Sequence, residues 1–139
     1  MFDVVVTKEV NAPAAKVWNL LADFGDISWV PGMGNVETEG QGVGMIRKIA
    51  VGEGPPAVER LEAMDSEAMS FRYSIVSGNP MPVENVQGGG KVEVLDDKRC
   101  LITWSATAAE VGVSEKEAAD MLSGFYTGLL DVISTVATA

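Results

Sequence analysis

The chain has 139 residues, of which 47% are hydrophobic and 22% charged, a composition typical of one globular domain large enough to bury a core. Its net charge of −10, with no run of Lys and Arg, argues against nucleic acid and anionic membranes as partners, because both bind clustered basic side chains. Neither a signal peptide nor an apolar run of ~20 residues is found, so we expect a single cytoplasmic domain over residues 1–139 without membrane insertion.

The absence of histidine restricts the chemistry further. Without an imidazole, hydrolases with a Ser or Cys triad and the usual zinc sites are excluded, and we expect neither a metal nor a cofactor. The alternating Gly40, Gly42 and Gly44 precede a predicted strand rather than a helix, so they indicate a hairpin turn and not a phosphate loop. Cys100 is the only cysteine, which rules out an internal disulfide.

The first elements are a strand and a helix. β-Branched residues predict a strand over residues 2–10. Pro13 fits the first position of a helix, where its missing N–H costs nothing, and apolar residues at helical spacing extend this helix to Asp23. We expect a short second helical turn over residues 26–29.

Six apolar, β-rich segments separated by turn residues follow. They cover residues 35–39, 43–51, 57–64, 69–76, 83–95 and 100–108. Consecutive strands with short connections pair as an antiparallel meander, and such a sheet is stable only when its apolar face is covered. The element long enough to cover it is the last helix, predicted over residues 114–136.

This last helix has a clear start and two unusual glycines. Ser114 and Glu117 form a capping box. Apolar residues then recur at helical spacing and predict a broad buried face made of Ala118, Met121, Leu122, Phe125, Tyr126, Leu129, Leu130, Val132, Ile133 and Val136. Gly124 and Gly128, one turn apart, each cost about 1 kcal/mol relative to alanine. Either the helix approaches the sheet closely there, or the missing side chains leave room for a ligand.

Several motifs resemble those of the START-like helix-grip (SRPBCC) superfamily, most of all its polyketide cyclase/dehydrase and lipid transport family. They are Asn11-Ala12-Pro13-Ala14-Ala15-Lys16-Val17-Trp18, Leu20-Leu21-Ala22-Asp23-Phe24, Trp29-Val30-Pro31-Gly32, Val43-Gly44, Arg47, Glu59-Arg60-Leu61, Asp65, Tyr73-Ser74-Ile75 and Trp104. The resemblance spans essentially the whole chain. It implies an α+β helix-grip fold, in which a curved antiparallel sheet (β-α-α-β6-α) wraps around the C-terminal helix and encloses an elongated apolar cavity.

Part of the chain, residues 43–85, is also similar to the plant abscisic acid receptors. The places of their two mobile pocket loops are taken by Gly54, Pro55 and Pro56, and by Ser77, Gly78 and Asn79. The similarity implies that these loops gate the cavity. The His, Arg and Leu that follow in the receptors' second loop are replaced here by residues 80–82, and no counterpart of the lysine that meets the hormone carboxylate is present.

Strand alternation suggests which side chains point inward. If the turn after residue 51 is centred on Glu53, Arg47 lies directly opposite Glu59, and both project onto the concave face. The residues expected to bind a ligand are Met45, Arg47, Ile49, Val51, Ala57, Glu59, Leu61, Phe71, Tyr73, Ile75, Gly124 and Gly128. The alternative is a filled core with a structural ion pair.

The three tryptophans and the three consecutive glycines at residues 88–90 can each be assigned to the core, to the cavity or to local chain geometry. Trp18 and Trp104 fit a core better than a site, and Trp29 either borders an entrance or anchors the short second helix. Three glycines at residues 88–90, inside a predicted strand, suggest a bulge, a flexible cavity wall or a turn.

Two functions from different classes follow. The first is binding or transport of a small hydrophobic molecule, such as a lipid, polyketide or hormone, in the cavity. The second is a cyclase or dehydratase in which Glu59 or Tyr73 moves a proton and Arg47 stabilises an enolate oxygen. We favour binding, because an Arg beside a Glu lowers the pKa of the carboxyl group, away from the range of a base that works at neutral pH.

Overall fold

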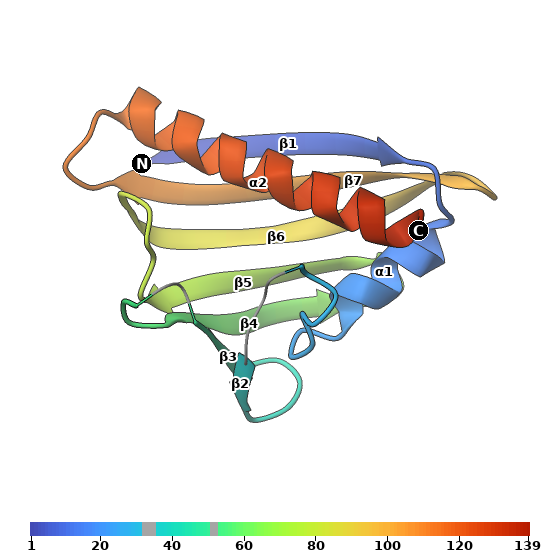
Figure 1. The fold of residues 1–139 in the computed structure, drawn as a ribbon, viewed down its shortest axis with the longest axis horizontal. Helices are drawn as coiled ribbons and strands as arrows, with labels where there is room; N and C mark the ends of the chain where they lie inside the picture. The colour runs from blue at the N-terminus through green and yellow to red at the C-terminus, as the bar shows by residue number, and fades with distance from the viewer. Residues whose placement is uncertain (32–35, 51–52) are drawn as a thin grey trace.

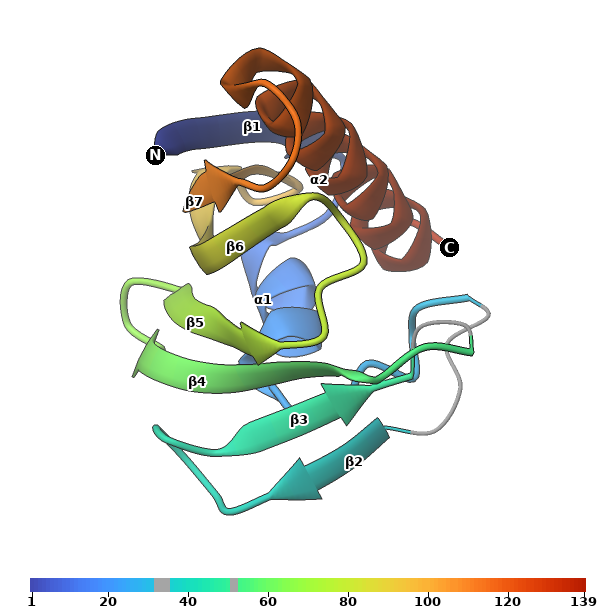
Figure 2. The same cartoon turned by 90° about the vertical axis from the view of Figure 1, so that its left-hand side faces the viewer.

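The computed structural model describes residues 1–31, 36–50 and 53–139. Within these residues the chain forms a seven-stranded sheet in the order β1-β7-β6-β5-β4-β3-β2, with a short helix α1 and a long helix α2 (Figure 1). Seen end on, the sheet curves so that both helices lie on its concave side (Figure 2). This arrangement confirms the predicted helix-grip architecture of a curved antiparallel sheet closed by the C-terminal helix.

Every predicted strand is present, with ends shifted by one to a few residues. The elements are β1 Phe2–Val10, α1 Ala14–Ala22, β2 Val36–Glu39, β3 Ile46–Ile49, β4 Ala57–Asp65, β5 Ser70–Ser77, β6 Val83–Asp96, β7 Arg99–Glu110 and α2 Glu115–Ala137. β2 to β7 form the expected antiparallel meander, and β1 pairs with β7 at the other edge. No helix in the described part of the chain is both long and apolar enough to cross a membrane.

The expected second helix is a turn instead. Asp26 Oδ1 accepts hydrogen bonds from the backbone N and the Oγ of Ser28, at 2.9 and 2.6 Å. An Asp side chain that accepts this backbone N–H favours a turn over a helix. The helix α1 also begins one residue later than predicted, because Pro13 is its N-cap, with φ −60° and ψ 144°.

The register between β4 and β5 is irregular at two points, between Val58 and Glu59 and between Leu61 and Ala63. The second irregularity places an extra residue on β4. Because a bulge moves the following side chains to the opposite face, Met64 is half-buried whereas Ala63 is exposed. Such a shift leaves no mark in an alternating sequence pattern.

The three glycines at residues 88–90 lie in the middle of β6, where the pairing with both neighbouring strands is regular. They form neither a bulge nor a turn. A Cβ atom added to Gly90 would lie 2.8 Å from Cε3 of Trp104, and one added to Gly88 would lie 3.1 Å from the hydroxyl oxygen of Tyr73. Gly88 and Gly90 make room for aromatic rings from the neighbouring strands, whereas a Cβ atom on Gly89 would meet the backbone and the side chain of β5.

Helix α2 lies across β1 and β7 (Figure 1). Ser114 is its N-cap, and the Ser114 Oγ accepts a hydrogen bond from the backbone N of Glu117 at 3.1 Å, as predicted. The side chains buried against the sheet are those of Ala118, Leu122, Tyr126, Leu130, Ile133 and Ala137. Phe125 and Met121, expected in this buried face, are 56% and 45% exposed, so the helix turns only one part of its broad apolar stripe to the core.

Candidate functional site

A cavity of about 510 Å³ lies between α2, α1 and the concave face of the sheet. Its wall is mostly apolar, and its charged side chains are those of Asp23, Arg47 and Glu59. The lining residues are Leu20, Leu21, Asp23, Ile27, Trp29, Val30, Arg47, Ile49, Glu59, Phe71, Tyr73, Trp104, Gly124, Phe125, Gly128, Leu129 and Val132. A volume of this size suits one small organic molecule.

The two glycines of α2 lie on the cavity side of the helix. A Cβ atom added to Gly124 or Gly128 would meet no other atom within 4 Å. Close approach of the helix to the sheet therefore does not explain them, which rules out that interpretation. The structure agrees with the other one: the missing side chains keep space open along this stretch of the cavity wall.

Arg47 and Glu59 form an ion pair in the wall, in the register predicted from the turn. The Nε of Arg47 donates to Glu59 Oε1 at 2.7 Å, Nη2 lies 2.7 Å from the same oxygen, and each of the two side chains is only 12% exposed. Nη1 donates to the carbonyl oxygen of Phe24 at 2.9 Å, and the guanidinium carbon lies 3.9 Å from the centroid of the Phe24 ring. The ion pair therefore fixes the loop after α1 to the sheet.

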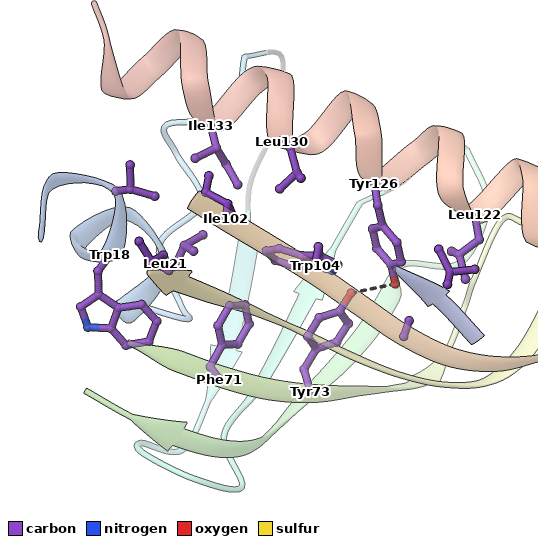
Figure 3. Packing of buried hydrophobic residues seen from close by; sticks show 14 of the residues in the cluster. Trp18, Leu21, Phe71, Tyr73, Ile102, Trp104, Leu122, Tyr126, Leu130 and Ile133 are labelled. Atoms are coloured by element: carbon purple, nitrogen blue, oxygen red, sulfur yellow. Dashed lines mark hydrogen bonds between the residues drawn. The ribbon is translucent and has the colours of Figure 1, made fainter. Parts of the chain in front are cut away.

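A second polar group consists of two tyrosines, of which Tyr73 lines the cavity and Tyr126 lies buried behind it. The hydroxyl oxygens of Tyr73, on β5, and Tyr126, on α2, lie 3.1 Å apart and are hydrogen-bonded to each other (Figure 3). Burial raises the pKa of Tyr73 well above the usual tyrosine value, and burial also raises the pKa of Tyr126. Both hydroxyls therefore keep their protons at neutral pH and are available as hydrogen-bond donors.

The structure brings together part of the predicted binding set. Arg47, Ile49, Glu59, Phe71, Tyr73, Gly124 and Gly128 line the cavity. Met45 and Leu61 instead line a second hollow, together with Phe24, whose ring packs against Arg47 and Phe71. Ala57 is buried in a small cluster with Ile27 and Ile49, and Ile75 packs against the main core. Val51 lies outside the described residues.

Other lining residues were not expected. They come from the end of α1 and the loop after it, from β7, and from the exposed side of α2: Leu20, Leu21, Asp23, Ile27, Trp29, Val30, Trp104, Phe125, Leu129 and Val132. Trp29 lines the cavity, and its place at an entrance stays a prediction. Trp104 is both a core residue, at 3% exposure, and a lining residue. One signal in the sequence could have indicated the lining residues of α2, because the apolar stripe on this helix is wider than a contact with the core needs.

The two expected gate loops contact each other. A Cβ atom on Gly78 would overlap the carbonyl oxygen of Pro56, so the backbones of the two loops touch at this point. Gly54, Pro55, Pro56, Ser77, Gly78 and Asn79 are not among the residues that line the cavity. Their role as a gate stays a prediction. Within the described residues, no cluster of acidic or thiol side chains is suited to hold a metal ion.

Comparison with known proteins gives a consistent picture. The family model for polyketide cyclase / dehydrase and lipid transport matches residues 1–138. MLP-like protein 423 of Arabidopsis thaliana is 33% identical over 116 residues, which cover 72% of this chain and 71% of that protein. A crystal structure of an uncharacterised protein from Bacillus thuringiensis superposes with a TM-score of 0.88 at 25% identity, covering 99% of this chain and 100% of the other.

The resemblance to the plant hormone receptors is confirmed over a shorter stretch. The abscisic acid receptor PYL6 of Arabidopsis thaliana is 34% identical over 82 residues, which cover 54% of this chain and 38% of the receptor. This match therefore spans well under half of the receptor.

Proposed function

The chain belongs to the polyketide cyclase / dehydrase and lipid transport family of the START-like helix-grip superfamily, and on that premise we propose that it binds or carries one small, mainly apolar molecule. The observation that supports this most directly is the cavity of about 510 Å³, lined mostly by apolar side chains. Burial of apolar ligand surface against such a wall supplies the binding energy. Gly124 and Gly128 keep α2 from filling that space.

The Arg47–Glu59 pair is the polar handle of the proposed site. Its guanidinium is held on one side by Glu59 and Phe24 and lies in the cavity wall. An Arg side chain has more N–H donors than these contacts use, so the remaining donors can reach a polar atom of the ligand. The pair thus both locks the fold and orients the bound molecule.

The geometry favours binding over cyclase or dehydratase chemistry. Burial raises the pKa of Tyr73 well above its usual range, so its hydroxyl does not serve as a base at neutral pH. Glu59 is held by Arg47, whose Nε donates to Glu59 Oε1 and whose Nη2 lies 2.7 Å from the same oxygen. The structure therefore gives Glu59 a structural partner, and Tyr73 keeps its proton.

Retention of a ligand is tested directly by native mass spectrometry of the purified protein. We expect a bound small molecule, or uptake of one equivalent of the neutral dye Nile red with a blue shift of its emission. Long-chain apolar molecules should displace the dye. Turnover assays with poly-β-ketone and hydroxy-enone substrates then separate a retained ligand from a consumed one. Failure of Nile red and of all apolar competitors to bind would contradict the proposal, and turnover would favour the enzyme.

A further inference from the structure

One buried N–H donor lacks an acceptor just behind the inner wall of the cavity, next to a pair of hydroxyl groups, in the part of the chain that the structure describes. The indole Nε1 of Trp104 is buried and makes no hydrogen bond within the described residues. The ring of Trp104 lies 6.1 Å from that of Tyr73 and 5.9 Å from that of Tyr126, measured between centroids. Figure 3 shows the three side chains converging from β7, β5 and α2. Trp104 and Tyr73 also line the cavity.

The two tyrosines do not satisfy each other completely. In a bond between two hydroxyl groups one oxygen donates and the other accepts, so the proton of the accepting hydroxyl needs a further partner. Burial is the main cause that raises the pKa of Tyr73 and of Tyr126, so both hydroxyls keep their protons. Unpaired donors in a buried place reduce stability. One acceptor atom placed beside them would satisfy both.

The sequence builds this arrangement through the glycines of β6. Gly88 lies opposite Tyr73, and Gly90 lies opposite Trp104. Without side chains at these positions, the two aromatic side chains lie over β6 and bring their polar atoms together. A strand of ordinary residues would separate them.

The charge of the lining restricts which acceptor fits. Asp23 and Glu59 carry negative charges in the wall against the single positive charge of Arg47, and the whole chain has a net charge of −10. A ligand carboxylate would therefore enter a negative field, whereas a carbonyl oxygen accepts hydrogen bonds without bringing a charge.

We propose that Trp104 Nε1 and the Tyr73–Tyr126 hydroxyl pair form a donor site for the carbonyl oxygen of an uncharged, mainly apolar ligand. The proposal rests on the binding function above and names the class of its ligand. Arg47 lies on β3, separated from the strand of Tyr73 by β4 alone, with its guanidinium carbon 6.0 Å from the centroid of the Tyr73 ring, so it can contact a neighbouring part of the same molecule.

Three flat molecules of nearly equal shape test this site: fluorene, fluorenone and a fluorenone carboxylate, each used to displace Nile red. Transfer out of water alone favours fluorene, because a carbonyl group gives up hydrogen bonds to water. The donor site reverses that order, and we expect fluorenone to displace the dye at about tenfold lower concentration than fluorene. The carboxylate should be the weakest of the three.

The variants Trp104→Phe and Tyr73→Phe remove one donor each. Both should lose most of the preference for fluorenone while still binding fluorene, and because Nile red also carries a carbonyl group, its own affinity is measured for each variant before the displacement. Trp18→Phe is the control, because Trp18 is a buried tryptophan outside the cavity lining. It should keep the full preference. If Trp104→Phe does not fold, Tyr73→Phe decides alone.

Equal displacement by fluorene and fluorenone would overturn the donor site, since the N–H and O–H groups would then be satisfied within the protein or by water. Tightest binding of the carboxylate would overturn it as well, and would assign the polar end of the ligand to Arg47. Either result leaves the cavity as a binding site. Failure of all three molecules to displace the dye would instead contradict the proposed function itself.

Discussion

The two halves of the sheet face the same helix in different ways. In the packed half, made of β1 and β7, side chains such as Val4 and Ile102 form one buried cluster with Leu130 and Ile133 of α2. In the open half, made of β3, β4 and β5, the concave side faces the cavity and presents Arg47, Glu59 and Tyr73. The difference indicates that contacts with α2 in the packed half stabilise the fold, whereas the open half supplies Arg47, Glu59 and Tyr73 to the site.

The largest expected effect comes from disrupting the Arg47–Glu59 ion pair in the open half. Arg47→Met or Glu59→Leu alone leaves a buried charge without its partner and should cost about 3–5 kcal/mol of unfolding free energy. The double variant should recover much of this loss, because neither charge is then buried alone. Urea unfolding of the four proteins in the double-mutant cycle measures the coupling, and Nile red affinity measures the effect on binding.

The exposed pair Arg60 and Glu62, on β4, is the matched control for this cycle. Their side chains are 47% and 42% exposed, and Arg60 Nε lies 2.6 Å from Glu62 Oε1. The same two substitutions there should each change stability by under about 1 kcal/mol. Additive effects of that small size at Arg47 and Glu59 as well would show that the inner pair is no more than a surface contact.

The second prediction compares neighbouring leucines of α2. Leu130 is 1% exposed in the packed half, so Leu130→Ala should lower the free energy of unfolding by about 2–5 kcal/mol. Leu129 is half-buried and lines the cavity, so Leu129→Ala should cost clearly less while changing dye affinity. Chemical denaturation of both variants checks the order. Equal losses of stability would mean that the two halves are not distinct.

The third prediction concerns β6, which joins the two halves. Gly90→Ala places a Cβ atom 2.8 Å from the ring of Trp104, and we expect a loss of about 1–3 kcal/mol together with a shifted tryptophan emission. Gly124→Ala, where the new Cβ meets no atom within 4 Å, should instead stabilise the protein by about 1 kcal/mol through helix propensity. A Gly90→Ala variant as stable as the parent would show that Trp104 is free to move aside.

The sequence was sufficient to predict what depends on local pattern or on resemblance. The strands, the capped helix α2, the register of Arg47 against Glu59 and the helix-grip fold could all be anticipated. Local pattern does not determine how a wide apolar stripe is divided between core and cavity, so Phe125 was placed in the core although it lies exposed at the cavity. The width of a stripe is a property of the helix, whereas its division depends on the curvature of the sheet.

Two further features could not be predicted, for different physical reasons. The bulge between Leu61 and Ala63 shifts one strand by a residue, and alternation alone gives no sign of it. The donor group of Trp104, Tyr73 and Tyr126 combines three elements far apart in the sequence. The three glycines of β6 are unusual in a strand, but the reason for Gly88 and Gly90 lies in aromatic rings contributed by other strands, which the local sequence does not reveal.

The central claim is that the space beside Gly128 belongs to a ligand and not to the core. It is tested most directly by Gly128→Leu with Gly128→Ala as its control, measuring both thermal stability and Nile red affinity. We predict that both variants melt no lower than the parent, because a residue with a higher helix propensity replaces glycine in open space. Gly128→Ala should keep dye binding, whereas Gly128→Leu should weaken it at least about tenfold, because the leucine occupies the cavity. Unchanged dye binding by a stable Gly128→Leu protein, or a fall of its melting temperature by many degrees, would contradict the account.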